Sequence, residues 1–236
     1  MKAPLHVILA ATFGLLLAAC AHTGGEPTIQ PGSTAQQDRG VYLSLVSAII
    51  DGGKPQAALA FLDDYLTRYP DDQRARLLKG DAYFKSGQMD AAGKIYQALL
   101  SKGSLPAAEL GLGRVKAAQG DWSDAVTYLR LAYQHSPADP KILNDYGYAL
   151  LKVADVGRAY GLLGRAYELR PNDQIIRNNF VLAAAKAGQE ARVEAVLRKL
   201  DDADQARLKA FVGEWEWQST TAVPQATPSV SEDKGP

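Results

Sequence analysis

The segment DPKILNDYGYALLKVADVGRAYGLLGRAYELRP, residues 139–171, decides how the rest of the chain is interpreted. Asp139 is a good N-cap, and Pro140 fits the first position of a helix, where a missing N–H does no harm. Apolar residues then recur at helical spacing on both sides of a turn near 154–155. Pro171 ends the second helix, because a proline disfavours helical geometry in the residue before it. The segment therefore predicts two short helices packed as a pair.

Two small residues, Gly147 and Ala159, predict where these helices come closest, at roughly 8–10 Å between their axes. The same pattern recurs in register every 33–34 residues along the chain. Its other copies are Val46, Ala58, Leu62, Tyr65 and Pro70; Gly80, Ala92, Tyr96, Leu99 and Ser104; Gly113, Ala125, Leu129, Ala132 and Pro137; and Val181, Val193, Leu197 and Leu200. Five copies that keep a fixed period indicate a repeat architecture, in which each unit stacks on its neighbours.

These copies resemble the tetratricopeptide repeat (TPR), whose motif places small residues at its eighth, twentieth and twenty-seventh positions and a proline at its thirty-second. The copies that contain Gly113 and Gly147 match at all four positions. The first copy departs at Val46 and Tyr65, and the last is the weakest, as expected for end repeats that lack a neighbour on one side. The resemblance covers residues 39–207. It implies an all-α fold, a TPR-type helical solenoid of about five helix-turn-helix repeats.

The first 19 residues are typical of an export signal. Lys2 precedes an apolar run of about 15 residues, which is short for a membrane span of about 20. The run ends in Leu17-Ala18-Ala19-Cys20, and Cys20 is the only cysteine in the chain. This ending resembles the lipobox of bacterial lipoproteins, in which the signal is cut before the cysteine and the cysteine is lipidated. The alternative is a plain signal peptide with an incidental cysteine.

The residue after the cysteine is Ala21 rather than Asp. Under the enterobacterial sorting rule, this choice implies transfer to the outer membrane. We therefore expect a protein attached to the membrane by lipid at Cys20, on the periplasmic face of the bacterial outer membrane.

Composition predicts four segments. Residues 1–19 are the signal peptide, and residues 20–38 are the lipidated cysteine and a flexible tether, with few large apolar side chains to bury. Residues 39–217 are the solenoid and a C-terminal capping helix, the latter predicted from the apolar spacing over about 203–212. Residues 218–236, rich in Thr, Pro, Ser and Gln, are a disordered tail.

Charge and motif content argue against other classes of protein. Loss of the signal removes Lys2 and leaves 25 basic and 26 acidic residues, with no basic stripe suited to nucleic acid. His6 falls in the signal, His22 in the tether, and His135 stands alone at a repeat end, so no cluster has the spacing of metal ligands. No Gly-rich loop follows a strand. We expect no catalysis, no cofactor and no metal.

In the TPR family, the first helix of each repeat lines a groove with its second, fifth, ninth, twelfth and thirteenth residues. By resemblance, that wall here includes Leu77, Phe84, Leu110, Lys141, Leu151 and Leu182. The members expected to bind a partner are Arg74, Asp81, Lys85, Arg114, Asn144, Tyr148, Lys152, Asn178 and Lys186. This mixture suits a protein or peptide partner. The set of residues that clamps a C-terminal carboxylate in some TPR domains is not reproduced. Trp122, which follows an inter-helix turn, is expected to pack in the core.

A narrower resemblance lies in NDYGYAL (144–150) and RNNFVLA (177–183). Both are similar to segments of the TadD-type lipoproteins of tight-adherence (Tad/Flp) pilus assembly, although Phe180 and the long tail depart from that pattern. The resemblance implies an outer-membrane scaffold that helps to assemble a type IV-like pilus and its secretin pore. The alternatives are a pilotin-like factor for secretin assembly in type IV pili or type II secretion, and a TPR regulator of cell-wall enzymes.

Overall fold

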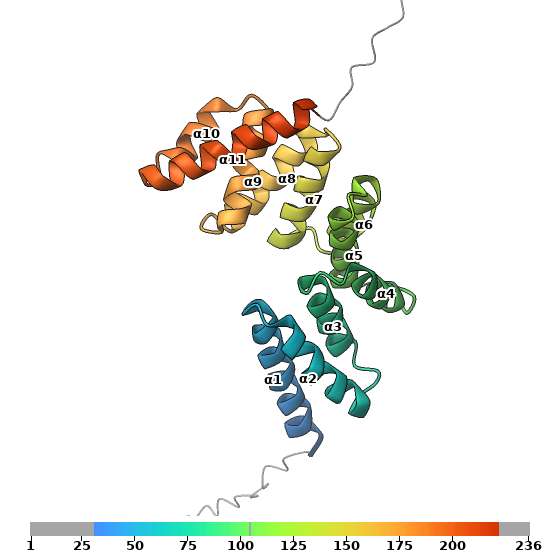
Figure 1. Cartoon of the computed structure of the whole chain (residues 1–236). Helices are drawn as coiled ribbons and strands as arrows, with labels where there is room; N and C mark the ends of the chain where they lie inside the picture. Colours follow the sequence, from blue (N-terminus) through green and yellow to red (C-terminus); the bar gives the residue numbers. More distant parts are fainter. Residues whose placement is uncertain (1–30, 104, 222–236) are drawn as a thin grey trace, which may run out of the picture. The chain divides into compact units, whose positions relative to one another are not determined.

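The structure is a computed structural model that describes residues 31–103 and 105–221, and over these residues it contains eleven helices and no strand. The helices are α1 (Pro31–Asp51), α2 (Pro55–Arg68), α3 (Gln73–Lys85), α4 (Met89–Leu100), α5 (Pro106–Ala118), α6 (Trp122–His135), α7 (Pro140–Lys152), α8 (Val156–Leu169), α9 (Gln174–Lys186), α10 (Glu190–Leu197) and α11 (Asp202–Thr221). The predicted all-α solenoid is confirmed: five helix pairs follow one another along the chain, and α11 packs against α9 (Figure 1).

Consecutive helices from α2 to α10 contact one another, and the first helices of successive repeats also touch. Of these first helices, α3, α5, α7 and α9 each contact the first helix of the following or preceding repeat. The chain divides into a unit that ends at Gly40 and a unit of residues 41–236, and all contacts described below lie within the second unit. Burial is therefore built from local neighbours, as expected of a repeat protein.

Glycines at the eighth repeat position let the two helices of a pair approach closely. A Cβ atom added to Gly147 would lie 2.6 Å from the Cγ of Leu163, and one added to Gly113 would lie 2.6 Å from the Cγ of Leu129. The second helix therefore fits its leucine against the bare backbone of the first. Ala159, the predicted contact of Gly147, is fully buried, but the closest approach belongs to Leu163.

The helix starts follow the predicted capping. The Asp139 carboxylate accepts hydrogen bonds from the backbone N–H groups of Lys141 and Ile142, at 2.8 and 3.4 Å. Asp72, Asp121, Asp155 and Asp173 cap their helices in the same way. Satisfying these otherwise unpaired donors fixes the start of each helix and hence the direction in which its side chains project.

Two predicted boundaries differ from the structure. Helix α1 begins at Pro31, so its first turns occupy residues that were assigned to the tether. Helix α11 continues to Thr221, four residues beyond the predicted end of the cap at 217. The signal segment, Cys20, Ser104 and residues 222–236 lie outside the described residues. In the part of the chain that is described, no helix combines the length and apolarity needed to cross a membrane.

Candidate functional site

A groove with a volume of about 630 Å³ runs along the first helices of successive repeats. Its walls come from the first helices α1, α3, α5, α7 and α9, with additional side chains from α4 and α6. The residues that line it are Ser47, Ile50, Asp51, Leu78, Asp81, Phe84, Lys85, Tyr96, Arg114, Ala117, Ala118, Trp122, Leu129, Lys141, Asn144, Asp145, Tyr148, Asp173, Ile175 and Ile176. A groove lined by residues of seven helices presents a long surface to a partner rather than a closed pocket.

Five of the nine predicted partner-binding residues line this groove, namely Asp81, Lys85, Arg114, Asn144 and Tyr148. Whether they bind a partner stays a prediction. They come from three successive repeats, since Asp81 and Lys85 lie on α3, Arg114 on α5, and Asn144 and Tyr148 on α7. For these five residues, the positional rule of the TPR family and the structure therefore agree that the side chain lies in the groove.

The other four predicted residues lie outside the lining of the groove. Arg74 donates a hydrogen bond to the Oγ of Ser44 at 2.9 Å. The ammonium of Lys152 lies 5.2 Å from the ring centroid of Trp122. The Oδ1 atom of Asn178 is buried with no hydrogen-bond partner among the described residues, and Lys186 is half-buried near the end of α9.

Three leucines that were expected in the groove wall belong to the core instead. Leu110, Leu151 and Leu182 are all buried and pack in the cluster that spans α5 to α11. Leu182 lies on α9, which is covered by α11, and Leu151 lies on α7, which contacts α9. The positional rule fails here because a neighbouring helix packs on each of these first helices, α11 on α9, α9 on α7 and α7 on α5.

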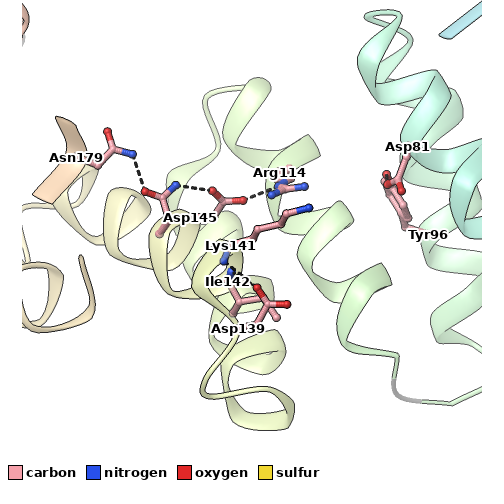
Figure 2. Close-up of polar contacts among 9 residues, drawn as sticks. Asp81, Tyr96, Arg114, Asp139, Lys141, Ile142, Asp145 and Asn179 are labelled. Atoms are coloured by element: carbon pink, nitrogen blue, oxygen red, sulfur yellow. Dashed lines mark hydrogen bonds and ion pairs between the residues drawn. The ribbon is translucent and has the colours of Figure 1, made fainter. Parts of the chain in front are cut away.

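A chain of hydrogen bonds along the wall of the groove joins the first helices of three repeats, α5, α7 and α9 (Figure 2). Asn179 Nδ2 on α9 donates to Asn144 Oδ1 on α7 at 2.9 Å, and Asn144 Nδ2 donates to Asp145 Oδ1 at 2.9 Å. The second carboxylate oxygen of Asp145 accepts from Arg114 Nε on α5 at 2.5 Å. Both amide side chains are buried, so this chain satisfies polar groups that would otherwise be costly.

Charged and hydroxyl groups on α3 to α7 face one another across the groove. Tyr96 donates its hydroxyl hydrogen bond to Asp81 Oδ1 at 2.7 Å. Burial raises the pKa of the Asp81 carboxyl above its ordinary value, although the Tyr96 hydrogen bond and the nearby charges of Arg114 and Lys141 act to lower it. Burial opposes the charge on Arg114, yet the pKa of its guanidinium is raised because Asp145 pairs with it. The carboxyl of Asp81 therefore sits in a partly desolvated wall opposite two cations.

Trp122 and Tyr148 form an aromatic corner in the lining of the groove. The ring of Trp122 meets the ring of Tyr148 edge to face, with centroids 6.0 Å apart, and both rings are only partly buried. Trp122 packs against the core as predicted, but it also lines the groove, which was not predicted. Ile175 also lines the groove, with 67% of its surface exposed. Such a corner suits one bulky apolar side chain of a partner.

Sequence reasoning missed several lining residues that the positional rule itself includes. Ser47, Ile50 and Asp51 occupy the ninth, twelfth and thirteenth positions of the first repeat, and Ala117 and Ala118 the twelfth and thirteenth positions of the third. Ile175 occupies the same second repeat position as Lys141. Asp145 is at the sixth position, which the rule does not assign to the groove, and it reaches the lining through its pairing with Arg114. No group of three or more potential metal ligands is present among the described residues.

Comparison with known proteins assigns the fold family. Two family models, both described as tetratricopeptide repeat, match residues 50–111 and 110–174. The chain is also 30% identical over 206 residues to the TPR repeat-containing protein PA4299 of Pseudomonas aeruginosa, an alignment that covers 85% of this chain and 79% of that protein.

Solved structures share the fold at lower identity. The TPR protein TTC0263 of Thermus thermophilus superimposes with a TM-score of 0.60 at 17% identity, covering 73% of this chain and 98% of that one. YrrB, described as a TPR protein with an unusual peptide-binding site, gives a TM-score of 0.52 at 15% identity and covers 80% and 98%. MamA of Desulfovibrio magneticus gives 0.51 at 16% identity and covers 76% and 95%. At these identities the likeness concerns the fold.

Proposed function

Because the chain belongs to the tetratricopeptide-repeat family, we propose that it is a scaffold that binds a segment of a partner protein in the groove between Asp81 and Tyr148. The observation that supports this is the composition of the groove. On one surface it gathers side chains from successive repeats. They are two lysines that make no ion pair among the described residues (Lys85 and Lys141), the exposed Ile175, and the aromatic pair of Trp122 and Tyr148. Peptide recognition uses such a combination, in which polar groups hold the main chain and apolar pockets hold side chains.

We further propose that the scaffold is attached to the periplasmic face of the outer membrane through lipid at Cys20. The support is the sequence Leu17-Ala18-Ala19-Cys20 after a short apolar run, with Ala21 following. Two or three acyl chains hold a protein on a membrane, because each buried CH₂ contributes roughly 0.8 kcal/mol. A protein held in this way would present its groove to partners within the envelope.

The machine we propose for this scaffold is a Tad/Flp pilus, in which it would help to assemble pilus or secretin components. The support is the pair of segments at 144–150 and 177–183. Two residues of these segments, Asn144 and Asn179, form the buried hydrogen bond that joins α7 to α9. The resemblance therefore involves residues that set the geometry of the groove as well as residues exposed in it.

The test is a triple substitution in the native host, Lys85→Ala, Lys141→Ala and Tyr148→Ala. The two lysines are exposed and make no ion pair among the described residues, and Tyr148 is only half-buried, so the variant should fold. We expect it to be abundant and membrane-associated but to lose surface pili and crosslinking to its partner. Linked contacts to one ligand fail together, so the loss should exceed that of any single substitution.

A matched control removes two cations and one apolar side chain outside the groove, by Lys94→Ala, Arg130→Ala and Leu169→Ala. All three side chains are exposed. We expect normal piliation from this control. Normal piliation in the triple groove variant would refute the groove as the working surface. Normal pili after complete deletion, with altered secretin assembly or altered cell-wall composition, would instead favour the pilotin-like or the cell-wall role.

A further inference from the structure

The groove carries carboxyl groups and cations on different first helices. Asp51 at the end of α1 and Asp81 on α3 supply carboxyl groups, and Lys85 at the end of α3 adds a cation on that side. The charge of Asp51 acts to raise the pKa of the Asp81 carboxyl. Arg114 on α5 and Lys141 on α7 supply the cations opposite. Figure 2 shows the nitrogen ends of Arg114 and Lys141 directed toward the side on which Asp81 lies. Both cations act electrostatically on the Asp81 carboxyl, but no ion pair joins Asp81 to either of them among the described residues.

Only part of this charge is satisfied within the protein. The Asp145 carboxylate is held by Arg114 and Asn144, and that of Asp173 accepts hydrogen bonds from the backbone at the start of α9. At Asp81 one oxygen accepts the hydrogen bond of Tyr96, which leaves the other to accept from a partner. Lys141 is exposed, and its ammonium makes no ion pair among the described residues. The groove thus offers an acceptor on one wall and a donor on the other.

This arrangement disfavours a charged group of either sign at the centre of the groove. A cation placed there would approach Asp81 but would be repelled by Arg114 and Lys141, and an anion would meet the reverse. A neutral dipole is favoured by both walls, and an unpaired charge also loses its hydration there. An extended polypeptide is such a dipole, because the N–H of one residue and the C=O of the next point to opposite sides of the chain.

We infer that Asp81 and Lys141 hold the main chain of an extended partner segment between them, Asp81 accepting from a backbone N–H and Lys141 donating to the neighbouring carbonyl, while an apolar side chain enters the corner of Trp122, Tyr148 and Ile175. The inference rests on the proposed function and names the chemistry of its partner. It makes Asp81 and Lys141 the residues that position the partner. The groove then selects its partner by one apolar side chain of the segment and not by the charge of the segment.

The probe is a 12-residue peptide selected from a random phage-displayed library against the purified full-length protein in detergent, then synthesised with a fluorescent label. Each backbone N–H of this peptide is removed in turn by N-methylation, and binding is measured against wild type, Asp81→Asn and Asp81→Leu. Asparagine keeps one oxygen for Tyr96 but places an NH₂ donor where the second carboxylate oxygen stood, and leucine keeps no polar atom, so both variants lose the acceptor for the peptide. Thermal melting checks that both variants are folded.

We expect one N-methylated position to weaken binding to wild type by about tenfold, the change expected for one lost hydrogen bond. The same N-methylation should cost nothing further in Asp81→Asn or in Asp81→Leu, because neither variant has the acceptor. Lys141→Met, at an exposed position, should weaken the unmodified peptide by a similar factor. Binding should change little between about 0.05 and 0.5 M salt, because recognition of a neutral main chain is weakly screened.

Two outcomes would overturn the inference while leaving the proposed function in place. One is that affinity falls steeply with salt and that Lys141→Met removes most of this salt dependence, which would assign recognition to charge. The other is that no N-methylated position couples to Asp81 although Tyr148→Ala abolishes binding. If the library yields no peptide, or yields only peptides whose binding is unaffected by Tyr148→Ala, the proposed function and this inference both fail.

Discussion

Gly147 on α7 lies directly against the side chain of Leu163 on α8, so that a Cβ atom at position 147 would come within 2.6 Å of the Leu163 Cγ. Leu163 is completely buried, and its Cγ is a branch point that has no room to retreat. Gly147→Leu should therefore lower the free energy of unfolding by about 2–3 kcal/mol, because overpacking a close-packed core strains the neighbouring helices. Denaturant titration measures this loss.

The matched control for Gly147 is Gly161 on α8, where an added Cβ would meet no atom within 4 Å. Gly161→Ala should raise the free energy of unfolding by roughly 0.5–1 kcal/mol, because alanine restricts the unfolded chain and suits a helix interior. A Gly147→Leu variant whose free energy of unfolding equals or exceeds that of wild type would contradict the close approach of α7 and α8.

Ala154 occupies a backbone conformation that the other repeats reserve for glycine. Its φ is 62°, and the equivalent turn residues Gly53, Gly87, Gly120 and Gly188 have φ between 66° and 82°. A side chain in this left-handed region costs roughly 1–2 kcal/mol, which glycine avoids. We expect Ala154→Gly to stabilise the protein by about 0.5–1 kcal/mol, since the greater freedom of glycine in the unfolded chain offsets part of the gain.

The reverse change, Gly120→Ala, is the control for Ala154→Gly. Gly120 has a φ of 82° and open space around its Cα, so only the backbone conformation opposes alanine. It should destabilise the protein by about 1 kcal/mol. Thermal melting of both variants tests the prediction, and a gain of stability in Gly120→Ala would contradict it.

The repeat pattern predicted the fold because the residues that carry it are set by local geometry. Glycine at position 147 and aspartate at position 139 have direct physical roles within one helix pair, so a single copy of the repeat reveals them. The period then extends the same pairing along the chain. The left-handed turn at Ala154 was not predicted, because the residue that reveals this conformation in the other repeats is absent there.

The groove was predicted less completely, because its lining depends on how repeats pack on each other. Leu182 has the right repeat position but is covered once α11 packs on α9. Asp145 has the wrong position but reaches the groove through its pair with Arg114 on another repeat. Contacts between residues about thirty apart in sequence determine both outcomes, and periodicity within one repeat does not contain that information.

Removal of the hydrogen bond between Asn144 and Asn179, which joins α7 to α9, should lower the free energy of unfolding. Both side chains are buried, at 7% and 8% exposure, so Asn144→Leu leaves the Asn179 amide without its acceptor. This should cost about 1–3 kcal/mol, the penalty of a buried unsatisfied polar group. A double-mutant cycle with Asn179→Leu should show the second substitution costing less than it does alone. Additive losses would mean that the two amides do not interact.

The lipid anchor is tested by mass spectrometry of the mature amino terminus. We expect a lipid-modified Cys20 as the first residue, since the chain before it resembles a cleaved signal. Cys20→Ser should leave the protein unprocessed or released from the membrane, because the thiol that carries the lipid is lost. An unmodified Cys20, or cleavage at another position, would contradict the anchor and leave a plain export signal.

The carboxyl of Asp81 predicts a pH-dependent difference between the wild type and the variant Asp81→Asn. Burial raises the pKa of this carboxyl above its ordinary value of 3.8, so the folded protein binds the proton more tightly than the unfolded chain does. Ionisation of Asp81 therefore destabilises the fold, and this cost is absent below about pH 3.8. The cost grows as pH rises from there through the folded pKa. Asparagine cannot ionise and keeps an oxygen to accept from Tyr96, so the variant should gain stability relative to wild type with rising pH.

We expect the difference in unfolding free energy between Asp81→Asn and wild type to increase between about pH 3 and pH 7, because every other titrating group is common to both proteins and cancels. Asp155→Asn is the control, because the hydrogen bond from Arg158 lowers the pKa of that carboxyl, so this variant should instead lose stability relative to wild type as pH rises. Denaturant titrations at several pH values give the comparison. A difference that stays constant, or that falls as pH rises, would show that the Asp81 carboxyl is not desolvated in the groove wall. The acceptor that we assign to the partner's main chain would then be exposed to water when the groove is empty.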